Sequence, residues 1–402
     1  MISALALAIS LSGREPFERG MADLFAYARN AAAAQFETAA AADPHLAIAY
    51  WGQALALGSD LNTPLTPESF AAAQQAIAKG VALEAFAPSE QVALIEAVRA
   101  RYAGSFADAT RDDDAYRTSM EAYVQAHPED DDATMLLVED LLERGSVAFD
   151  DDGSPLGTTS AQAVALTQRV LARSPLHLLA NHLCIHLYDR APNPSPAIPC
   201  AQRLDAMTFA PEQEHLAHMP AHVWIELGDG RRADASSERA WALHPTRYAE
   251  HDAYVALSAA MLDGDAAAIA VWSDRLGAVQ GQPVDLAPPP YARDAQQLER
   301  QKHYDAALEV LRREAVREGA SAEMLPFYPA GVRIGALLYR LRRYDQARDA
   351  FLAVLAHRPR DPRALFGLAL AQRALADDGD AALTQARFER AWAGGALTIA
   401  DF

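Results

Sequence analysis

Two neighbouring stretches, HLLANHLCIHLYDR and EHLAHMPAHVWIEL, together hold six of the twelve histidines of this 402-residue chain. Each stretch contains a pair four residues apart, His182 with His186 and His218 with His222. A spacing of four places both members of a pair on one face of an α-helix. Clustered imidazoles suit Zn, Cu, Fe or Ni rather than Mg or Ca. The spacing therefore predicts a transition-metal site.

The two histidine pairs occupy matching positions behind two prolines. The members of each pair lie seven and eleven residues after a proline, Pro175 in the first stretch and Pro211 in the second. If these are equivalent positions of a repeat, the pairs project from neighbouring helices, which pack about 8–10 Å apart. Imidazoles from such helices can reach one ion at roughly 2.0–2.1 Å. We therefore predict one four-histidine metal site, with the ligands His182, His186, His218 and His222.

Two carboxylates accompany this pattern and are the candidate catalytic groups. Glu139 stands eleven residues after Pro128, the matching position one repeat earlier, and would act as a general base or an oxygen ligand. Asp189 follows His186 by three residues and would orient a histidine ring or bind the ion. A further set is expected to line the groove or support the ligands: His177, His215, His251 and Asp252.

Two questions stay open at this level. Repeats copy sequence, so histidines in register also suit a polar groove without metal. Pro220 lies between His218 and His222, and proline either kinks a helix or sits in its first turn. A continuous helix keeps both histidines on one face, whereas a helix that begins near Met219 leaves His218 on the entering loop.

The composition narrows the function classes. The net charge is −19, from 35 basic and 54 acidic side chains, and such a chain repels phosphate backbones. We therefore expect no nucleic-acid partner. No run of about 18 apolar residues is present, so we expect no membrane span. The two cysteines, Cys184 and Cys200, are interpreted as small core residues rather than a disulfide framework.

The chain begins with the apolar stretch MISALALAISL, which has no Lys or Arg before it. A secretory signal peptide normally opens with a positively charged region. We interpret the stretch as a terminal helix and expect a cytoplasmic protein. The alternative is the remnant of a clipped leader, which would make the protein an exported one.

The elements that must position the histidines form a helical repeat. Apolar residues recur at three- and four-residue spacing, and Ala, Leu, Glu, Arg and Gln dominate. One frame recurs, with a small residue twelve positions and a second residue eight positions before a proline. Ala32, Phe36 and Pro44 give one copy, and Ala347 and Phe351 belong to another. In this frame the small residue allows close helix packing, the large one fills the gap and the proline ends the helix.

This frame resembles the second half of a tetratricopeptide (TPR) repeat. The resemblance extends from about residue 15 to 395 and implies an all-α, TPR-like right-handed solenoid of antiparallel helix pairs. We expect residues 1–402 to form a single solenoid. Its N-terminal part, residues 15–280, would carry the histidine site, and residues 289–402 would form the C-terminal repeats.

Three motifs resemble those of a bacterial TPR family annotated mostly by its repeats. They are Tyr-Trp-Gly at residues 50–52, Asn-His-x-x-Ile-His at 181–186 and His-x-x-His-Met-Pro-x-His at 215–222. Members of that family usually carry a glutamate shortly after the second motif, where this chain has Asp189. The resemblance implies the TPR fold and a shared histidine site, and it implies no particular reaction.

Two function hypotheses follow. In the first, a transition metal (Cu, Fe or Zn) is bound in the concave groove, where a small molecule or peptide binds. If the protein is an enzyme, that ligand is transformed by metal-dependent oxidoreductase or hydrolase chemistry. In the alternative, the chain is a metal-free TPR module for protein–protein interaction. Phosphate-binding glycine loops, the Gly-x-Ser-x-Gly elbow and the His-Glu-x-x-His motif are absent from the sequence, so other enzyme classes have little support.

Overall fold

The computed structural model describes residues 11–143, 147–150, 153–189, 191, 193–284, 290–320, 330–392 and 396–402. Regular structure in these residues is helical, and the only β-type pairings are two isolated bridges. The expected all-α fold is thus confirmed. The apolar segment at residues 1–10, on which the alternative of an exported protein rests, lies outside the described residues.

The chain divides into two compact units. Unit 1 contains residues 1–187 and 206–216, and unit 2 contains residues 188–205 and 217–402. The predicted division near residues 280–289 stays a prediction.

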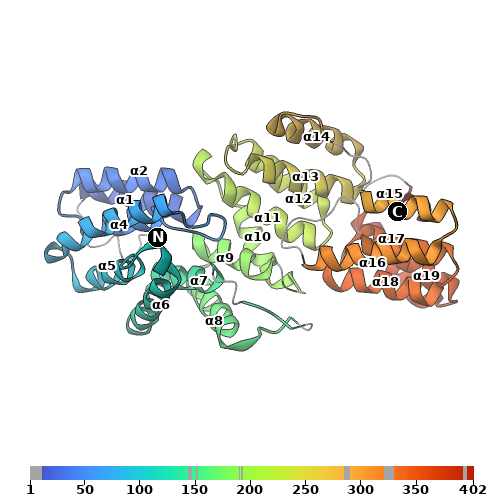
Figure 1. The fold of residues 1–402 in the computed structure, drawn as a ribbon, viewed down its shortest axis with the longest axis horizontal. Coiled ribbons are helices and arrows are strands. Elements are labelled where there is room, and N and C mark those ends of the chain that lie inside the picture. Colours follow the sequence, from blue (N-terminus) through green and yellow to red (C-terminus); the bar gives the residue numbers. More distant parts are fainter. Residues whose placement is uncertain are drawn as a thin grey trace. The chain divides into compact units, whose positions relative to one another are not determined.

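Unit 1 is built from the first eight α-helices and most of the ninth. Their bounds are α1 Leu11–Phe25, α2 Arg29–Ala42, α3 Ala47–Leu57, α4 Pro67–Ala82, α5 Ser89–Arg101, α6 Ala109–Ala126, α7 Asp131–Glu143, α8 Gly157–Arg173 and α9 Leu178–Tyr188. Each helix from α1 to α7 packs on the next one along the chain, and Figure 1 shows α1 and α2 lying side by side.

Unit 2 holds the remaining helices, with residues 217–226 of α11. Their bounds are α10 Ile198–Asp205, α11 Glu214–Glu226, α12 Gly230–Trp241, α13 Ala249–Asp263, α14 Ala266–Gln280, α15 Pro290–Arg300, α16 Tyr304–Ala320, α17 Ala330–Arg340, α18 Tyr344–His357, α19 Pro362–Ala374 and α20 Asp378–Ala391. Successive helices again pack on one another, from α12 to α14 and from α15 to α20.

The repeat frame read from the sequence sets how the helices pack. Phe36 on α2 is fully buried, and its ring lies against Gly20 on α1 and Gly52 on α3. A Cβ atom at Gly52 would stand 2.5 Å from the ring, and one at Gly20 would stand 2.8 Å from it. Only a glycine leaves room there, because real Cβ contacts are never that short. The large residue of the frame therefore fills a space between three helices, as predicted.

The same arrangement recurs in the C-terminal repeats. Phe351 on α18 lies between Gly335 on α17 and Gly367 on α19, and a Cβ atom at either glycine would meet its ring at 2.5 Å or less. Phe351 is part of the apolar core that runs through α15–α20. The TPR-like packing of antiparallel helix pairs is thus confirmed in both units.

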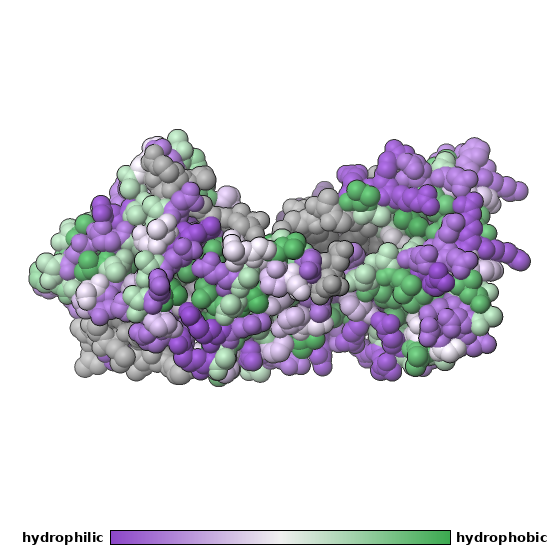
Figure 2. Space-filling view, turned by 90° about the horizontal axis from the view of Figure 1, so that it is seen from below, coloured by the Kyte–Doolittle hydropathy of each residue, from purple (hydrophilic) through white to green (hydrophobic). Residues whose placement is uncertain are grey.

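The surface carries many hydrophilic side chains. Figure 2 shows hydrophilic residues over much of the face in view, with smaller hydrophobic patches between them. None of the described helices has the length and apolar character needed to cross a membrane. Cys184 and Cys200 are both buried, as expected, but both are disulfide-bonded, so their interpretation as simple core residues is wrong.

Candidate metal centres

The helices that carry the histidines are continuous. In α9, the side-chain amide of Asn181 donates to the carbonyl oxygens of Pro175 and His177, each at 2.9 Å, and so ties the first turn to the preceding loop. Helix α11 runs from Glu214 to Glu226 with Pro220 inside it. The question left open by the sequence is thereby answered, because His218 and His222 share one helix and one face.

In unit 2, three imidazoles converge to form a group that we call the unit 2 triad: His218, His222 and His251. The Nε2 atom of His222 lies 3.2 Å from Nε2 of His218 and 3.1 Å from Nε2 of His251. His218 and His222 stand on α11, and His251 stands near the start of α13. One nitrogen from each residue lies within 4.8 Å of the others, which is compact enough for all three to bind one ion.

Two carboxylates lie on the far side of these rings. Asp252 Oδ1 is 3.4 Å from Nδ1 of His218, and both side chains are fully buried. Asp189 Oδ1 is 3.7 Å from Nδ1 of His222. A carboxylate beside Nδ1 favours the tautomer that carries its proton there. In that tautomer the Nε2 lone pairs of His218 and His222 would face each other, an arrangement that a bound cation would stabilise.

The electrostatic environment of the unit 2 triad favours the neutral form of His218 and His251. Burial, with the neighbouring His222 and His251, holds the pKa of His218 well below its ordinary value. Burial, with His222, lowers the pKa of His251 to about 3. Metal ligation requires neutral imidazole, so no proton has to be displaced from these two rings at neutral pH.

In unit 1, a second group forms the unit 1 triad: His182, His186 and His215, whose ligand atoms also lie within 4.8 Å of one another. Nδ1 of His182 lies 2.8 Å from the carbonyl oxygen of Phe25, and a carbonyl only accepts. Nδ1 of His182 therefore carries the proton, and its Nε2 lone pair faces Nε2 of His186 at 3.1 Å. His215 is held by the side-chain amide of Asn62, 3.1 Å from its Nε2.

Tyr27 packs against all three rings of the unit 1 triad. Its ring centroid is 4.5 Å from that of His182, and it stacks on His186 and His215 at 6.1 and 5.8 Å. Tyr27 is only 2% exposed. The unit 1 triad thus has an aromatic wall, whereas the unit 2 triad has carboxylates behind its rings.

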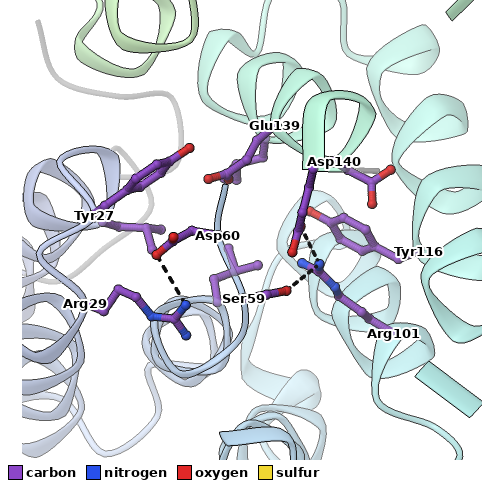
Figure 3. Close-up of a pocket in the computed structure, with 12 residues that line it drawn as sticks. Tyr27, Arg29, Ser59, Asp60, Arg101, Tyr116, Glu139 and Asp140 are labelled. Carbon is purple, nitrogen blue, oxygen red and sulfur yellow. Dashed lines mark hydrogen bonds and ion pairs between the residues drawn. The ribbon is translucent and has the colours of Figure 1, made fainter. Parts of the chain in front are cut away.

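Beyond Tyr27 lies a polar cavity of about 20 Å³, room for one water molecule. In Figure 3 the Tyr27 hydroxyl points toward the carboxylate of Glu139. Neighbouring acids are paired with arginines: Arg29 lies 3.3 Å from Asp60, and Arg101 lies 2.9 Å from Glu143.

Glu139 itself is in a different electrostatic situation. Burial, with the charges of Glu143 and Asp60, raises its pKa to about 8, although its hydrogen bond with Tyr27 and the charge of Arg101 act against this. Burial and the charge of Glu139 likewise raise the pKa of Tyr27. With a pKa of about 8, Glu139 is mostly protonated at pH 7, unlike its arginine-paired neighbours.

The residues predicted from the sequence fall into two separate triads and their surroundings. Each predicted histidine pair is completed by a residue that we had expected only in a supporting role, His215 in unit 1 and His251 in unit 2. Binding of one ion by all four predicted ligands stays a prediction. Asp252 and Asp189 both support the unit 2 triad. His177 lies outside the triads, with its Nε2 3.0 Å from Asp132.

Three residues of these surroundings were not predicted. Tyr27 and Asn62 come from loops far from the histidine stretches, and no periodic signal marks them. Glu226 was within reach of the spacing argument, because it follows His222 by four residues on the same face of α11. Burial raises the pKa of Glu226 to about 7, with Arg358 lowering it and Asp189 raising it.

Comparison with known proteins identifies no family for this chain. No protein-family model and no curated protein matches the chain. Yeast Tom70 is similar at 12% identity with a TM-score of 0.32, over 90% of this chain and 81% of its own. The TPR domain of P58(IPK) is similar at 16% identity with a TM-score of 0.25, over 94% and 97%.

A monomeric mutant of IFIT1, solved with m7Gppp-AAAA, is similar at 16% identity with a TM-score of 0.29, over 90% of this chain and 67% of its own. Similarities this weak carry no argument about this chain. The chain's own helix packing, with a phenylalanine held between two glycines in both units, establishes its TPR-like architecture.

Proposed function

We propose that this protein is a TPR-like scaffold that binds a transition-metal ion in each histidine triad and uses the open side of the metal to bind a small molecule or peptide. The observation that carries the proposal is the orientation of the unit 2 rings. Asp252 lies at Nδ1 of His218, and Asp189 lies at Nδ1 of His222, while the Nε2 atoms converge. With their protons on Nδ1, His218 and His222 would present their Nε2 lone pairs to a common point.

The spacing of the nitrogens suits one ion. Two nitrogens 3.1–3.2 Å apart that each lie about 2.0–2.1 Å from a metal subtend about 100° at it, between octahedral and tetrahedral values. Three imidazole ligands favour Zn, Cu or Fe. Sites with three protein ligands keep a position open for water or substrate.

The open position defines the chemistry that we propose. A bound ion would act as a Lewis acid or would activate water, as in metal-dependent hydrolases, or would support oxidoreductase chemistry if it is Cu or Fe. The chain's own residues supply the supporting groups. Asp252 and Asp189 lie beside Nδ1 of His218 and His222 and would orient these rings, and Glu226, one turn further along α11, would act as a proton acceptor.

A metal-free interaction module remains the second candidate. The observation in its favour is that nitrogens 3.1–3.2 Å apart also match a single N–H···N hydrogen bond between neutral imidazoles. In that case the triads would be polar contacts for a peptide in a TPR groove. Peptide binding that a chelator leaves unchanged would favour this candidate.

The cellular compartment of the protein decides which metal ions are available to it. Cys184 and Cys200 are both disulfide-bonded, and disulfides are typical of oxidising compartments. This supports the alternative of an exported protein over the cytoplasmic location.

Metal content tests the proposal directly. We would measure it by mass spectrometry on untagged protein after reconstitution with Zn, Cu or Fe, comparing the wild type with His186→Ala, His222→Ala and the exposed control His303→Ala. Two ions per chain are expected in the wild type and in the control, and one in each triad variant. A single ion lost in both triad variants would favour the shared four-histidine site, and sub-stoichiometric metal in the wild type would refute metal binding.

A further inference from the structure

Tyr27 stands at a turn that the fold uses repeatedly. Its φ is 58°, in the left-handed region. Its N–H donates to the carbonyl of Leu24 at 3.0 Å, and the next N–H donates to Asp23 at 2.9 Å, which is the Schellman pattern that ends many helices. The same pair of bonds closes other turns, whose left-handed residues are Gly228, Gly264, Lys302, Arg342 and Ala376.

Comparison of these turns shows whether the turn itself requires a buried side chain at the left-handed position. The left-handed position favours glycine, because other residues are strained there. At the non-glycine turns Lys302, Arg342 and Ala376, the side chain is exposed. Tyr27 is the one of this set with a large buried side chain. The turn does not require its ring, so the ring's burial calls for another explanation.

The contacts of the ring supply one. Tyr27 contacts imidazoles from both helices of the unit 1 triad, His182 and His186 on α9 and His215 on α11. It lies nearly parallel to His186 and His215, at interplanar angles of 23° and 18°. A flat surface in that place restricts how these two imidazoles can rotate, and therefore where their nitrogens point.

The ring is itself fixed at both ends. The Schellman turn holds its backbone, and its hydroxyl points toward the carboxylate of Glu139, on α7 (Figure 3). The unit 2 triad is supported differently, by carboxylates at Nδ1. The two triads thus have distinct means of holding their imidazoles.

We propose that Tyr27 is the positioning residue of the unit 1 metal centre, and that its ring, anchored by the α1–α2 turn and by Glu139, holds His186 and His215 in the orientation that binds the ion. This inference rests on the proposed function. Tyr27 acts through the ligands and does not bind the metal.

Cobalt(II) binding tests this inference, because the visible absorption of the ion reports its coordination geometry. His251→Ala serves as the background that leaves the unit 1 centre as the measurable site. In this background we expect Tyr27→Leu, which fills the space without a flat ring, and Tyr27→Gly, which suits the turn, to weaken binding by about tenfold or more and to alter the absorption bands. Tyr27→Phe, which keeps the ring, should restore most of both.

Two controls distinguish positioning from a general loss of structure. Lys302→Gly, at an equivalent turn, should leave cobalt binding unchanged. In the reciprocal background His186→Ala, where the unit 2 centre is measured, Tyr27→Leu should bind cobalt as tightly as the background protein.

The possible results distinguish the role of Tyr27 from metal binding by the unit 1 triad. Unchanged affinity and spectrum in folded Tyr27→Leu would overturn the inference while leaving the metal centre intact. If Tyr27→Gly fails to fold, the comparison of Leu with Phe still decides. Loss of cobalt from the His251→Ala background itself would overturn both the unit 1 centre and the role of Tyr27.

Discussion

Replacement of Asp252 separates metal affinity from folding stability. Its Oδ1 lies 3.4 Å from Nδ1 of His218, with both side chains fully buried. In Asp252→Asn an amide of nearly the same shape stays beside Nδ1, so the packing around the ring is kept, but the negative charge that makes the imidazole a stronger ligand is lost. Removal of such support typically costs 10–100-fold in metal affinity. We expect about tenfold weaker binding for the Asn variant and a larger loss for Asp252→Ala.

This loss has a calculable effect on thermal stability. At a metal concentration of about 100 times the wild-type Kd, binding stabilises the fold by about 2.7 kcal/mol. Tenfold weaker binding reduces that contribution by about 1.3 kcal/mol, or roughly 3–5 °C in Tm for a unit of this size. Without metal, the Asn variant should melt close to the wild type, because its shape and its contact with His218 are retained.

The assay combines isothermal titration of Zn²⁺ with thermal denaturation, each with and without metal. Asp263→Asn is the matched control: it lies on the same helix, α13, is 3% exposed, and lies eleven residues beyond Asp252. It should leave the Zn²⁺ affinity unchanged. Unaltered affinity in Asp252→Asn, or an equal loss in Asp263→Asn, would refute the role that we assign to the carboxylate.

Two further predictions concern stability. The pKa of Glu139 is raised to about 8 by burial and neighbouring acids. Between about pH 4.5 and 8 the folded state therefore holds a proton that the unfolded state has released. The free energy of unfolding falls as pH rises through this window, by about a few kcal/mol at most. Denaturant titrations at pH 5 and pH 8.5 should show a shallower fall in Glu139→Gln, and equal slopes would contradict this. Gly52→Ala places a Cβ 2.5 Å from the Phe36 ring and should destabilise by about 1–3 kcal/mol. The control Gly379→Ala meets nothing within 4 Å and should be neutral or slightly stabilising; equal urea midpoints for the two would refute the packing argument.

The sequence predicted the helices and their packing well, because the repeat frame records local rules. Ala32 and Phe36 are both fully buried, and α2 ends at Ala42, two residues before Pro44. The four-residue spacing of the histidines likewise placed each pair on one helix face.

The third histidine of each triad was harder to assign. Counting from the prolines compares like positions of successive helices. It cannot show that His215, on α11, meets the pair on α9, or that His251, near the start of α13, meets the pair on α11. Those contacts depend on how far each helix is shifted along its axis and how it is rotated about that axis, and both are set by packing.

Glu139 shows the same limit of a positional argument. Its level in the repeat matches that of the histidines, yet Tyr27, from a turn over a hundred residues away, lies between Glu139 and the unit 1 rings. No spacing rule in the sequence marks that turn.

The phenylalanine held between two glycines has a consequence for how the chain folds. Phe36 belongs to α2, yet the glycines that accommodate it lie on α1 and on α3, so its burial is complete only when the next repeat has begun. The cooperative segment is therefore offset from the sequence repeat by one helix. A nascent chain that ends after α2 leaves this ring without one wall, and the addition of α3 locks the preceding pair. Order propagates along such a chain by nearest-neighbour coupling, each helix completing the core of the pair before it.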